Sequence, residues 1–327
     1  MPTGRFAPSP TGPLHVGNLR TAVVAWLSAR ATGSDFLIRI EDLDRAAARE
    51  VHVRSHLADL AALGIVGDGE VTRQSERFSR YEEALARLDA CGLLYPCYCT
   101  RREVQAAVAA PHGPSPEGAY PGTCRGLTPG ERAAREAAGR RPSWRVRAGG
   151  ERVEVVDRHY GRFAGLVDDF VVRRSDGVPA YQLAVVVDDH DQGIGEVVRG
   201  DDLLDSTPRQ VWLARRLGLP VPAHAHVPLV LGPDGRRLAK RHGAVTLADL
   251  AARGVEPPVA LGALAASLCL VPPGTPVGSV NDLVTAYDPE RLPSGPWRFD
   301  PASPDWPGPE TIVNSARTEG GISQSRF

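Results

Sequence analysis

The chain has 327 residues, of which 42% are hydrophobic and 24% charged, and its formal net charge is −1. This composition is ordinary for a globular protein, and the near-neutral total provides no general attraction for nucleic acid. No apolar run reaches the roughly 18–20 residues that a membrane helix needs, and the N-terminus lacks the apolar core of a signal peptide. We therefore expect a cytoplasmic protein with no membrane partner.

The N-terminal third has the pattern of a parallel α/β unit. GRFAPSP predicts a short strand that leaves into a turn, and apolar residues at helical spacing follow from Leu14 to Arg30. DFLIRI predicts the next strand, and SHLADLAALGI and ERFSRYEEALARLDACG predict two further amphipathic helices. Because a helix connects successive strands, the pattern indicates an α/β fold with a parallel sheet.

The middle of the chain has a different residue pattern. Within the region from Cys97 to about Ser143, the segment APHGPSPEGAYPG predicts a Pro/Gly loop flanked by cysteines. Residues 143–193 alternate apolar and polar side chains, which predicts strands. Asp188, Asp189 and His190 fall inside that predicted strand region. Side chains alternate sides along a strand, so three consecutive ligands rarely share one metal. We expect these residues to be structural or to lie at the edge of a nucleotide site.

The C-terminal part is predicted to be helical and then irregular. A helical pattern runs from about Leu247 to Leu270. From Ser303 onward the sequence is polar and punctuated by Pro and Gly, which predicts a poorly ordered tail.

The segment HVGN follows the first predicted turn and precedes the first predicted helix. Backbone N–H groups at a helix N-terminus form an anion site, Gly17 permits close approach of a ligand, and His15 and Asn18 can donate hydrogen bonds to phosphate oxygens. The short pattern alone is common in proteins, so it needs support from elsewhere in the chain.

That support comes from Lys240, which is the only lysine among the 38 Lys and Arg residues. It lies in RRLAKRHG, between Arg237 and Arg241. A compact ammonium on a flexible stem can follow charge that develops on a phosphoryl group, whereas a guanidinium is a bulkier, fixed fork. The single lysine therefore indicates a phosphate-directed role.

Four segments, in order, resemble the class I aminoacyl-tRNA synthetases of the glutamyl type. RFAPSPTGPLHVGN is similar to their His-Ile-Gly-His region and RRLAKR to their Lys-Met-Ser-Lys-Ser loop; FLIRIEDLDR and YQLAVVVDDHDQGIGEVVRGDDLLDSTPRQ also match. The resemblance covers about Gly4 to Leu250. It departs from the family at Asn18, where a second histidine is usual, and around Lys240, where Arg237, Ala239 and Arg241 replace Lys, Ser and Ser.

The resemblance implies a Rossmann-like core in two halves, 1–95 and 179–235. An insertion at 96–178 would carry zinc and contact RNA, and a Lys loop with a small helical extension would occupy 236–302, before the tail at 303–327. ATP is expected at the carboxyl ends of the strands, where the strand order reverses.

The resemblance also implies the substrates and their residues. L-Glutamate would be activated by ATP, with Mg²⁺, and His15, Asn18 and Lys240 would be catalytic. The residues implied for ATP are His15, Gly17, Asn18 and Lys240. The residues implied for glutamate are Arg5 and Arg199 for its side-chain carboxylate, Glu41 for its ammonium, and Ala7, Ser9 and Tyr181 in the same pocket. Arginine suits a carboxylate because its guanidinium binds it in a fork.

The five cysteines include Cys97, Cys99 and Cys124 within 28 residues. An odd count in a cytoplasmic chain argues against a disulfide framework, and a structural zinc site needs four ligands. From the chemistry alone, His112 is the natural fourth ligand; the segment also resembles the zinc motif of glutamyl-queuosine tRNA(Asp) synthetases, which implies Tyr120 instead. We expect Cys91 and Cys269 to be core residues.

Only 87 residues follow Lys240, which we interpret as too few for an anticodon-binding domain. The chain thus resembles the stand-alone glutamyl paralogue that attaches glutamate to the queuosine base in the anticodon loop of tRNA(Asp). The arginine-rich region from Arg125 to Arg174 would contact RNA phosphates, and we expect a monomer. Two alternatives stay open: a truncated glutamyl-tRNA synthetase that charges the acceptor end, and a catalytically silent tRNA-binding paralogue.

Overall fold

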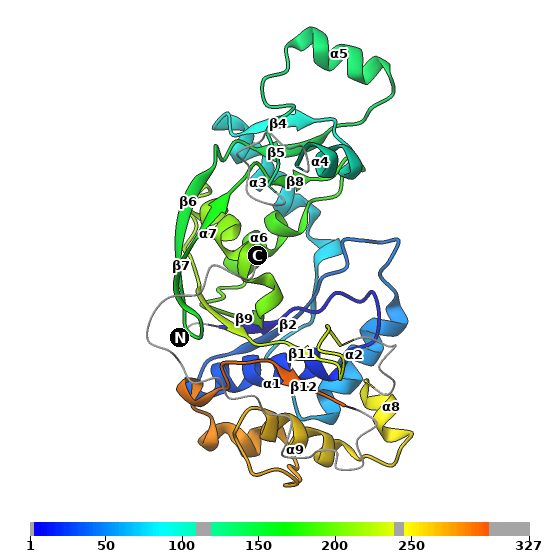
Figure 1. Cartoon of the computed structure of the whole chain (residues 1–327), viewed down its shortest axis with the longest axis vertical. Helices are drawn as coiled ribbons and strands as arrows, with labels where there is room; N and C mark the ends of the chain where they lie inside the picture. Colours follow the sequence, from blue (N-terminus) through cyan, green and yellow to red (C-terminus); the bar gives the residue numbers. More distant parts are fainter. Residues whose placement is uncertain (1–2, 109–118, 239–244, 301–327) are drawn as a thin grey trace.

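A computed structural model describes residues 3–108, 119–238 and 245–300 of the chain (Figure 1). The first sheet contains three parallel strands in the order β1-β2-β3, at Gly4–Phe6, Phe36–Ile40 and Thr72–Arg73. The helices of this part are α1 (Val16–Ala31), α2 (Glu50–Ala62) and α3 (Phe78–Ala90), with the short 3-10 helix η1 (Gln74–Glu76) between α2 and α3. These elements confirm the strand–helix–strand unit predicted from the sequence.

A second sheet continues the first. Its order is β7-β6-β10-β9, with β9 at Glu196–Gly200 and β10 at Ala223–Val227 running parallel. A parallel bridge between Thr3 and Ile194 connects the start of β1 to the segment that enters β9. The parallel strands therefore follow the order β3-β2-β1-β9-β10, and the order reverses between β1 and β9. Ligands of open α/β sheets bind outside the carboxyl ends of the strands at such a reversal.

The segment between the two halves divides between two sheets. Strands β4 (Leu94–Cys97), β5 (Ser143–Val146) and β8 (Val171–Arg173) form an antiparallel sheet of their own, which carries helices α4 (Arg101–Val108) and α5 (Pro129–Ala137). In contrast, β6 (Glu151–Asp157) pairs with β7 (Gly161–Val167) and joins β10 in the second sheet. The predicted insertion thus contributes directly to the sheet that carries β9.

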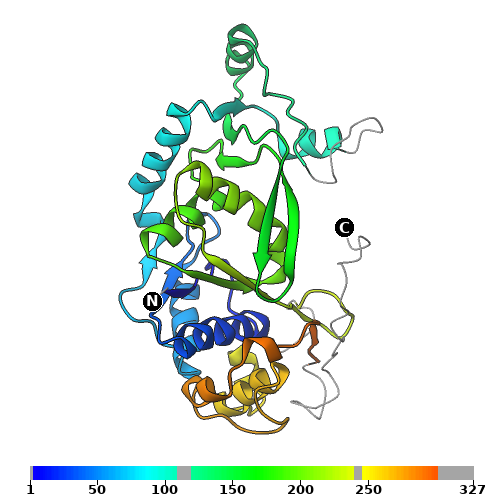
Figure 2. The ribbon, with the colours of Figure 1, turned by 90° about the vertical axis from the view of Figure 1, so that its left-hand side faces the viewer.

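The second half and the C-terminal part complete the described chain. Helix α6 covers Tyr181–Asp191, and η2 (Asp201–Ser206) leads into α7 (Thr207–Arg216). The C-terminal elements are β11 (Val230–Leu231), α8 (Leu247–Ala251), α9 (Pro257–Ser267), η4 (Val280–Ala286), η5 (Pro289–Arg291) and β12 (Trp297–Arg298). They lie against the α1 side of the molecule, at the opposite end from α4 and α5 (Figures 1 and 2). No helix of the described residues has the length and apolar character needed to cross a bilayer.

The strand predicted over residues 181–191 is wrong, because this segment is helix α6. A short continuous apolar run does not distinguish a buried strand from a buried helix. All residues from Leu183 to Asp189 are buried, so the polar residues that end the run do not mark an exposed face. The argument from alternating side chains therefore does not apply to Asp188 and Asp189, which instead take different partners around a helix.

Two smaller expectations also need correction. The single helix predicted from Leu247 to Leu270 is two helices, because Gly254 has a positive φ of 79° and Pro257 begins the second helix. Cys91 and Cys269 are not core residues: Cys91 is exposed, and Cys269 is partly exposed with a φ of 59°. Both follow the last residues of a helix, where the chain turns toward solvent.

Candidate active site

A cleft of about 610 Å³ opens at the carboxyl ends of β1 and β9, where the strand order reverses. The residues that line it come from β1, the following turn, α1, the end of β2, α6, β9, η2 and the segment around β11. They include nine residues that the sequence singled out: Arg5, Ala7, Ser9, His15, Gly17, Asn18, Glu41, Tyr181 and Arg199. Segments far apart in the sequence therefore meet at one site.

The entry to α1 has the geometry of an anion site. His15 caps the helix: its Nδ1 accepts from the backbone N–H groups of Gly17 (3.1 Å) and Asn18 (3.3 Å). Burial lowers the pKa of His15, with Asp202 acting in the opposite direction. A neutral imidazole that accepts at Nδ1 carries its proton on Nε2. His15 can thus offer one N–H donor to a ligand while its other nitrogen holds the turn.

Asn18 completes this capping arrangement. Its Oδ1 accepts from the backbone N–H of His15 at 3.1 Å, so the two residues hold each other in a capping box. The amide nitrogen of Asn18 keeps its two donors. Asn18 therefore accepts a backbone hydrogen bond that a charged imidazole could not accept, and it also lines the cleft.

Gly17→Ala is expected to weaken binding of the ATP that the resemblance implies, because it would displace the His15 ring. A Cβ at position 17 would lie 2.9 Å from Cε1 and Nδ1 of that ring, closer than Cβ contacts allow. Gly12→Ala is the matched control, because a Cβ there would meet nothing within 4 Å and Gly12 lines the same cleft. We expect the KM for ATP in pyrophosphate exchange to rise about tenfold for Gly17→Ala. This is the order expected when one hydrogen bond to a charged phosphate is lost. Equal values for the two variants would contradict the role of the ring.

Arg5 is held in the cleft wall by two contacts. Its Nε donates to Asp189 Oδ1 at 3.2 Å and one terminal nitrogen donates to the carbonyl of Val198 at 3.1 Å. The side chain is 4% exposed. Two of its five N–H groups are engaged, and Arg5 makes no other side-chain hydrogen bond to residues 3–108, 119–238 and 245–300. Arg5 therefore presents unused donors to the cleft.

Arg199, on β9, is more fully engaged. Its Nε donates to His226 Nε2 at 3.0 Å, one terminal nitrogen to Gln210 at 2.7 Å, and the other to Thr207 Oγ1 at 2.8 Å and the Leu203 carbonyl at 3.3 Å. Burial lowers the pKa of Arg199. Four of its five N–H groups are used, so the guanidinium is fixed in place and has one donor left for a ligand.

Glu41 and Tyr181 supply the other polar groups of the cleft. Burial raises the pKa of Glu41, and the guanidinium groups of Arg39 and Arg5 act in the opposite direction. A ligand ammonium would stabilise the ionised carboxylate further. Burial also raises the pKa of the Tyr181 phenol, which keeps it as an O–H donor.

Sequence inspection predicted Asp188 and Asp189 to be structural or at the edge of a nucleotide site, but it did not identify their partners. Asp189 accepts from both Arg5 and Arg39, the latter at 2.8 Å, and Asp188 accepts from Gln74, Arg77 and Tyr81. These contacts show Asp188 and Asp189 to be structural. The signal for them was a pair of acids in an apolar run, since buried carboxylates require partners.

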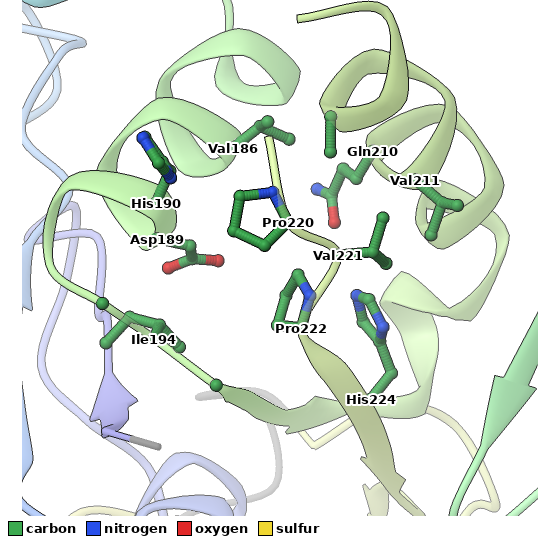
Figure 3. Close-up of a pocket in the computed structure, with 13 residues that line it drawn as sticks. Val186, Asp189, His190, Ile194, Gln210, Val211, Pro220, Val221, Pro222 and His224 are labelled. Atoms are coloured by element: carbon green, nitrogen blue, oxygen red, sulfur yellow. The ribbon is translucent and has the colours of Figure 1, made fainter. Parts of the chain in front are cut away.

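A second cavity, of about 270 Å³, lies behind the same wall (Figure 3). It is lined by residues of α6 and α7, the segment that leads into β9, and the prolines that precede β10. Asp189, which contacts Arg5, and Gln210, which contacts Arg199, both border it. His224 also lines it, and burial lowers the pKa of this imidazole to about 3. The residues that contact Arg5 and Arg199 therefore border a largely apolar cavity that also contains the neutral imidazole of His224.

Lys240 lies outside the described residues, but its flanks are placed. Leu238 and Arg237 line the cleft, and Arg237 pairs with Asp202 at 3.3 Å. At the other end, the Val245 carbonyl accepts from the backbone N–H of Val16, at the start of α1. The six residues 239–244 thus connect two points at the margin of the anion site.

The three clustered cysteines meet at one point. The sulfur atoms of Cys97, Cys99 and Cys124 lie within 4.8 Å of one another, and those of Cys99 and Cys124 are 3.6 Å apart. Tyr120 Oη lies 3.3 Å from the sulfur of Cys97 and 3.8 Å from that of Cys99. Four potential ligand atoms from two distant segments are therefore in contact.

These distances fit a tetrahedral zinc ion. Bonds of about 2.3 Å to sulfur and 2.0–2.2 Å to oxygen place tetrahedral ligands about 3.8 Å (S···S) and 3.5 Å (S···O) apart. Burial raises the pKa of the Tyr120 phenol, so a metal would have to displace its proton. The alternative ligand His112 lies outside the described residues.

The neighbourhood holds Tyr120 rigidly. The guanidinium of Arg145 stacks 3.7 Å from the centre of the Tyr120 ring, and the Tyr120 backbone N–H donates to Asp168. Asp168 in turn accepts from Arg209 on α7, at 2.7 Å. The cysteine cluster is therefore connected through these contacts to the helix that carries Gln210.

Comparison with known proteins agrees with this geometry. Residues 3–287 match the catalytic domain of the class I tRNA synthetases (E and Q). The chain is 58% identical over 294 residues to the glutamyl-Q tRNA(Asp) synthetase of Nocardia farcinica, covering 90% of this chain and 92% of that one. It is 52% identical over 311 residues to the enzyme of the same name from Symbiobacterium thermophilum, covering 91% and 96%. A crystal structure of a glutamate tRNA ligase from Elizabethkingia meningosepticum, in complex with its amino acid, superposes with a TM-score of 0.77 at 26% identity, covering 91% of this chain and 67% of that one.

Proposed function

Because the chain belongs to the glutamyl-Q tRNA(Asp) synthetases, within the class I (E and Q) tRNA synthetase family, we propose that it activates L-glutamate with ATP and transfers it to queuosine in tRNA(Asp). One observation carries the proposal for this chain. Nine residues predicted from scattered segments line a single cleft where the strand order reverses, and two buried arginines stand in its wall.

The cleft chemistry suits glutamate. Arg5 and Arg199 offer N–H donors to the side-chain carboxylate, and Glu41 offers a carboxylate to the ammonium. Ala7, Ser9 and Tyr181 border the same space. With both ends of the substrate held, its α-carboxylate is left free to react.

Activation requires the α-carboxylate to attack the α-phosphate of ATP and expel pyrophosphate. The new bond is an acyl–phosphate anhydride, and negative charge increases on the phosphoryl oxygens as it forms. His15 Nε2–H, the amide of Asn18 and the N-terminus of α1 are the donors placed to stabilise this charge, and Gly17 lets the nucleotide approach the backbone. Lys240 would add a cation, and Mg²⁺ would accompany ATP.

Two sites on a tRNA carry a hydroxyl that could accept the glutamyl group. Queuosine carries a cyclopentene diol, so its hydroxyl can attack the mixed anhydride and form an ester while AMP leaves. The same reaction at the terminal ribose would charge the acceptor end, so docking decides between them. The closely similar relatives named for queuosine transfer favour the first outcome. Arginines of residues 125–174, in the segment that carries the cysteine cluster, are candidates for phosphate contacts.

Transfer to tRNA tests the proposal. Labelled glutamate should go to tRNA(Asp) from cells that make queuosine and not to tRNA(Asp) from cells that cannot. The label should stay on an anticodon stem-loop fragment after the acceptor end has been cut away. Equal labelling of both tRNAs on the terminal adenosine would instead favour an acceptor-end synthetase, and absence of pyrophosphate exchange would favour a silent tRNA-binding paralogue.

We also propose that Cys97, Cys99, Cys124 and Tyr120 hold one structural zinc ion. The metal would cross-link β4 and the loop before α5, which the described contacts otherwise join only through side chains. Purified protein should contain about one zinc per chain, and Cys97→Ser or Cys124→Ser should lose it. Cys91→Ser is the matched control, because Cys91 is exposed and outside the cluster.

The fourth ligand is tested separately by metal analysis of two variants. Tyr120→Phe removes the phenol oxygen that lies among the sulfurs, and it should lower zinc retention under dialysis against a chelator. His112→Ala should retain the metal. The reverse pattern, with zinc kept by Tyr120→Phe and lost by His112→Ala, would assign the site to three cysteines and a histidine.

A further inference from the structure

Behind Arg199 is a chain of buried side chains that ends in an acid from another part of the sequence. Arg199 Nε donates to His226 Nε2 at 3.0 Å, and His226 Nδ1 lies 2.6 Å from Asp157 Oδ2. Both side chains are fully buried, on neighbouring parallel strands β10 and β6. Asp157 belongs to the segment 96–178 and not to either predicted half of the core.

The hydrogen bonds determine the protonation state of His226. Arginine is only a donor, so His226 Nε2 must be an acceptor and cannot carry a proton. The proton must then be on Nδ1, where it is donated to the Asp157 carboxylate. Asp157 thereby selects the one imidazole tautomer that can hold Arg199.

The surroundings support a neutral ring in a fixed position. Burial lowers the pKa of His226, with Asp157 acting in the opposite direction. Asp157 is itself held, because it accepts from the backbone N–H groups of His159, Tyr160 and His226. These hydrogen bonds fix Asp157 and the His226 ring relative to each other. The Nε2 atom of His226, which accepts from Arg199, therefore has little freedom to move.

We propose that His226 and Asp157 are positioning residues that orient the Arg199 guanidinium toward the side-chain carboxylate of glutamate. The inference rests on the proposed function, because it assumes that Arg199 contacts that carboxylate. Arg199 has one N–H left for substrate, and the direction of that single donor depends on the groups that hold the other four. Glutamate recognition by β9 therefore depends on a carboxylate supplied by β6.

Two substitutions of His226 separate its two contacts. An asparagine amide lies near the position of the histidine Nδ1, so His226→Asn can still donate to Asp157 but presents no acceptor to Arg199. A glutamine amide reaches the position of Nε2, so His226→Gln can accept from Arg199 through its oxygen. The readout is ATP–pyrophosphate exchange, with the KM for glutamate and the KM for ATP measured for each variant.

The expected result is a rise in the glutamate KM. His226→Asn should raise it about tenfold or more, the order expected for loss of one hydrogen bond to a charged group, while the KM for ATP changes less than about twofold. His226→Gln should recover most of the loss. The control is His224→Gln. His224 lines the second cavity (Figure 3) and lies parallel to His226 with ring centres 6.3 Å apart, and within the described residues it makes no hydrogen bond to Arg199.

Three outcomes would overturn the inference. They are an unchanged glutamate KM in His226→Asn, a His226→Gln variant no better than His226→Asn, and an equal rise in both KM values. Each would show that His226 and Asp157 only pack behind Arg199 and do not orient its guanidinium. Wild-type protein without any glutamate-dependent exchange would instead overturn the proposed function, and this inference with it, so the two failures are distinguishable.

Discussion

Arg5→Ala is expected to lower kcat/KM for glutamate in pyrophosphate exchange by about 10²–10³-fold. Removing one partner of a buried ion pair costs about 3–5 kcal/mol, because the remaining charge is left without compensation in a poorly solvated site. Arg5 is 4% exposed, and three of its N–H groups make no described hydrogen bond. A bound carboxylate would therefore be the main acceptor for these three donors. Asp189, which Arg5 also contacts, keeps Arg39 in the variant and limits the loss of stability.

Two comparisons make this prediction specific. Arg54→Ala removes an exposed arginine of α2 and should leave the exchange rate unchanged. Glutamine should be a poor substrate for the wild-type protein, because its amide leaves the arginine donors without an anionic partner. Similar rates with glutamine and glutamate, or an Arg5→Ala variant as active as Arg54→Ala, would rule out the assigned pocket. Exchange that strictly required tRNA would favour the acceptor-end alternative.

Lys240→Ala is expected to reduce pyrophosphate exchange by at least about 10²-fold, the usual cost of removing one group that stabilises transition-state charge. The ends of its segment are at the cleft, through Leu238 on one side and the Val245–Val16 hydrogen bond on the other. Lys240→Arg should also be clearly impaired, because a planar guanidinium does not reproduce a compact ammonium. The thermal midpoint of both variants should equal that of the wild type.

Arg236→Ala is the matched control for Lys240, because Arg236 is an exposed cation four residues earlier in the same segment of chain. It should retain full exchange activity. Wild-type activity in Lys240→Arg would show that any cation suffices at this position, and the single lysine would then have no special role.

The candidate site illustrates how far local sequence can predict structure. The strand–turn–helix from Gly4 to Ala31 followed from turn residues and helical spacing, which act between neighbours in the chain. The ordered motifs also predicted which residues would gather, and nine of them line one cleft. The close spacing of Cys97 and Cys99, with Cys124 downstream, predicted a cluster that the structure contains.

By itself, the sequence determined the chemistry-bearing residue types, the parallel α/β class and the helix that begins at the anion site, because turn chemistry and periodicity act over a few residues. The tertiary structure alone decided that residues 181–191 form a helix, since a short apolar run buried on all sides satisfies either period. It also decided that Asp157 lies behind Arg199. That contact joins residues 42 positions apart through His226, and it exists only because β6 pairs with β10 beside β9. Packing between distant strands has no local signature, and for that reason the groups that orient the site became visible only in the fold.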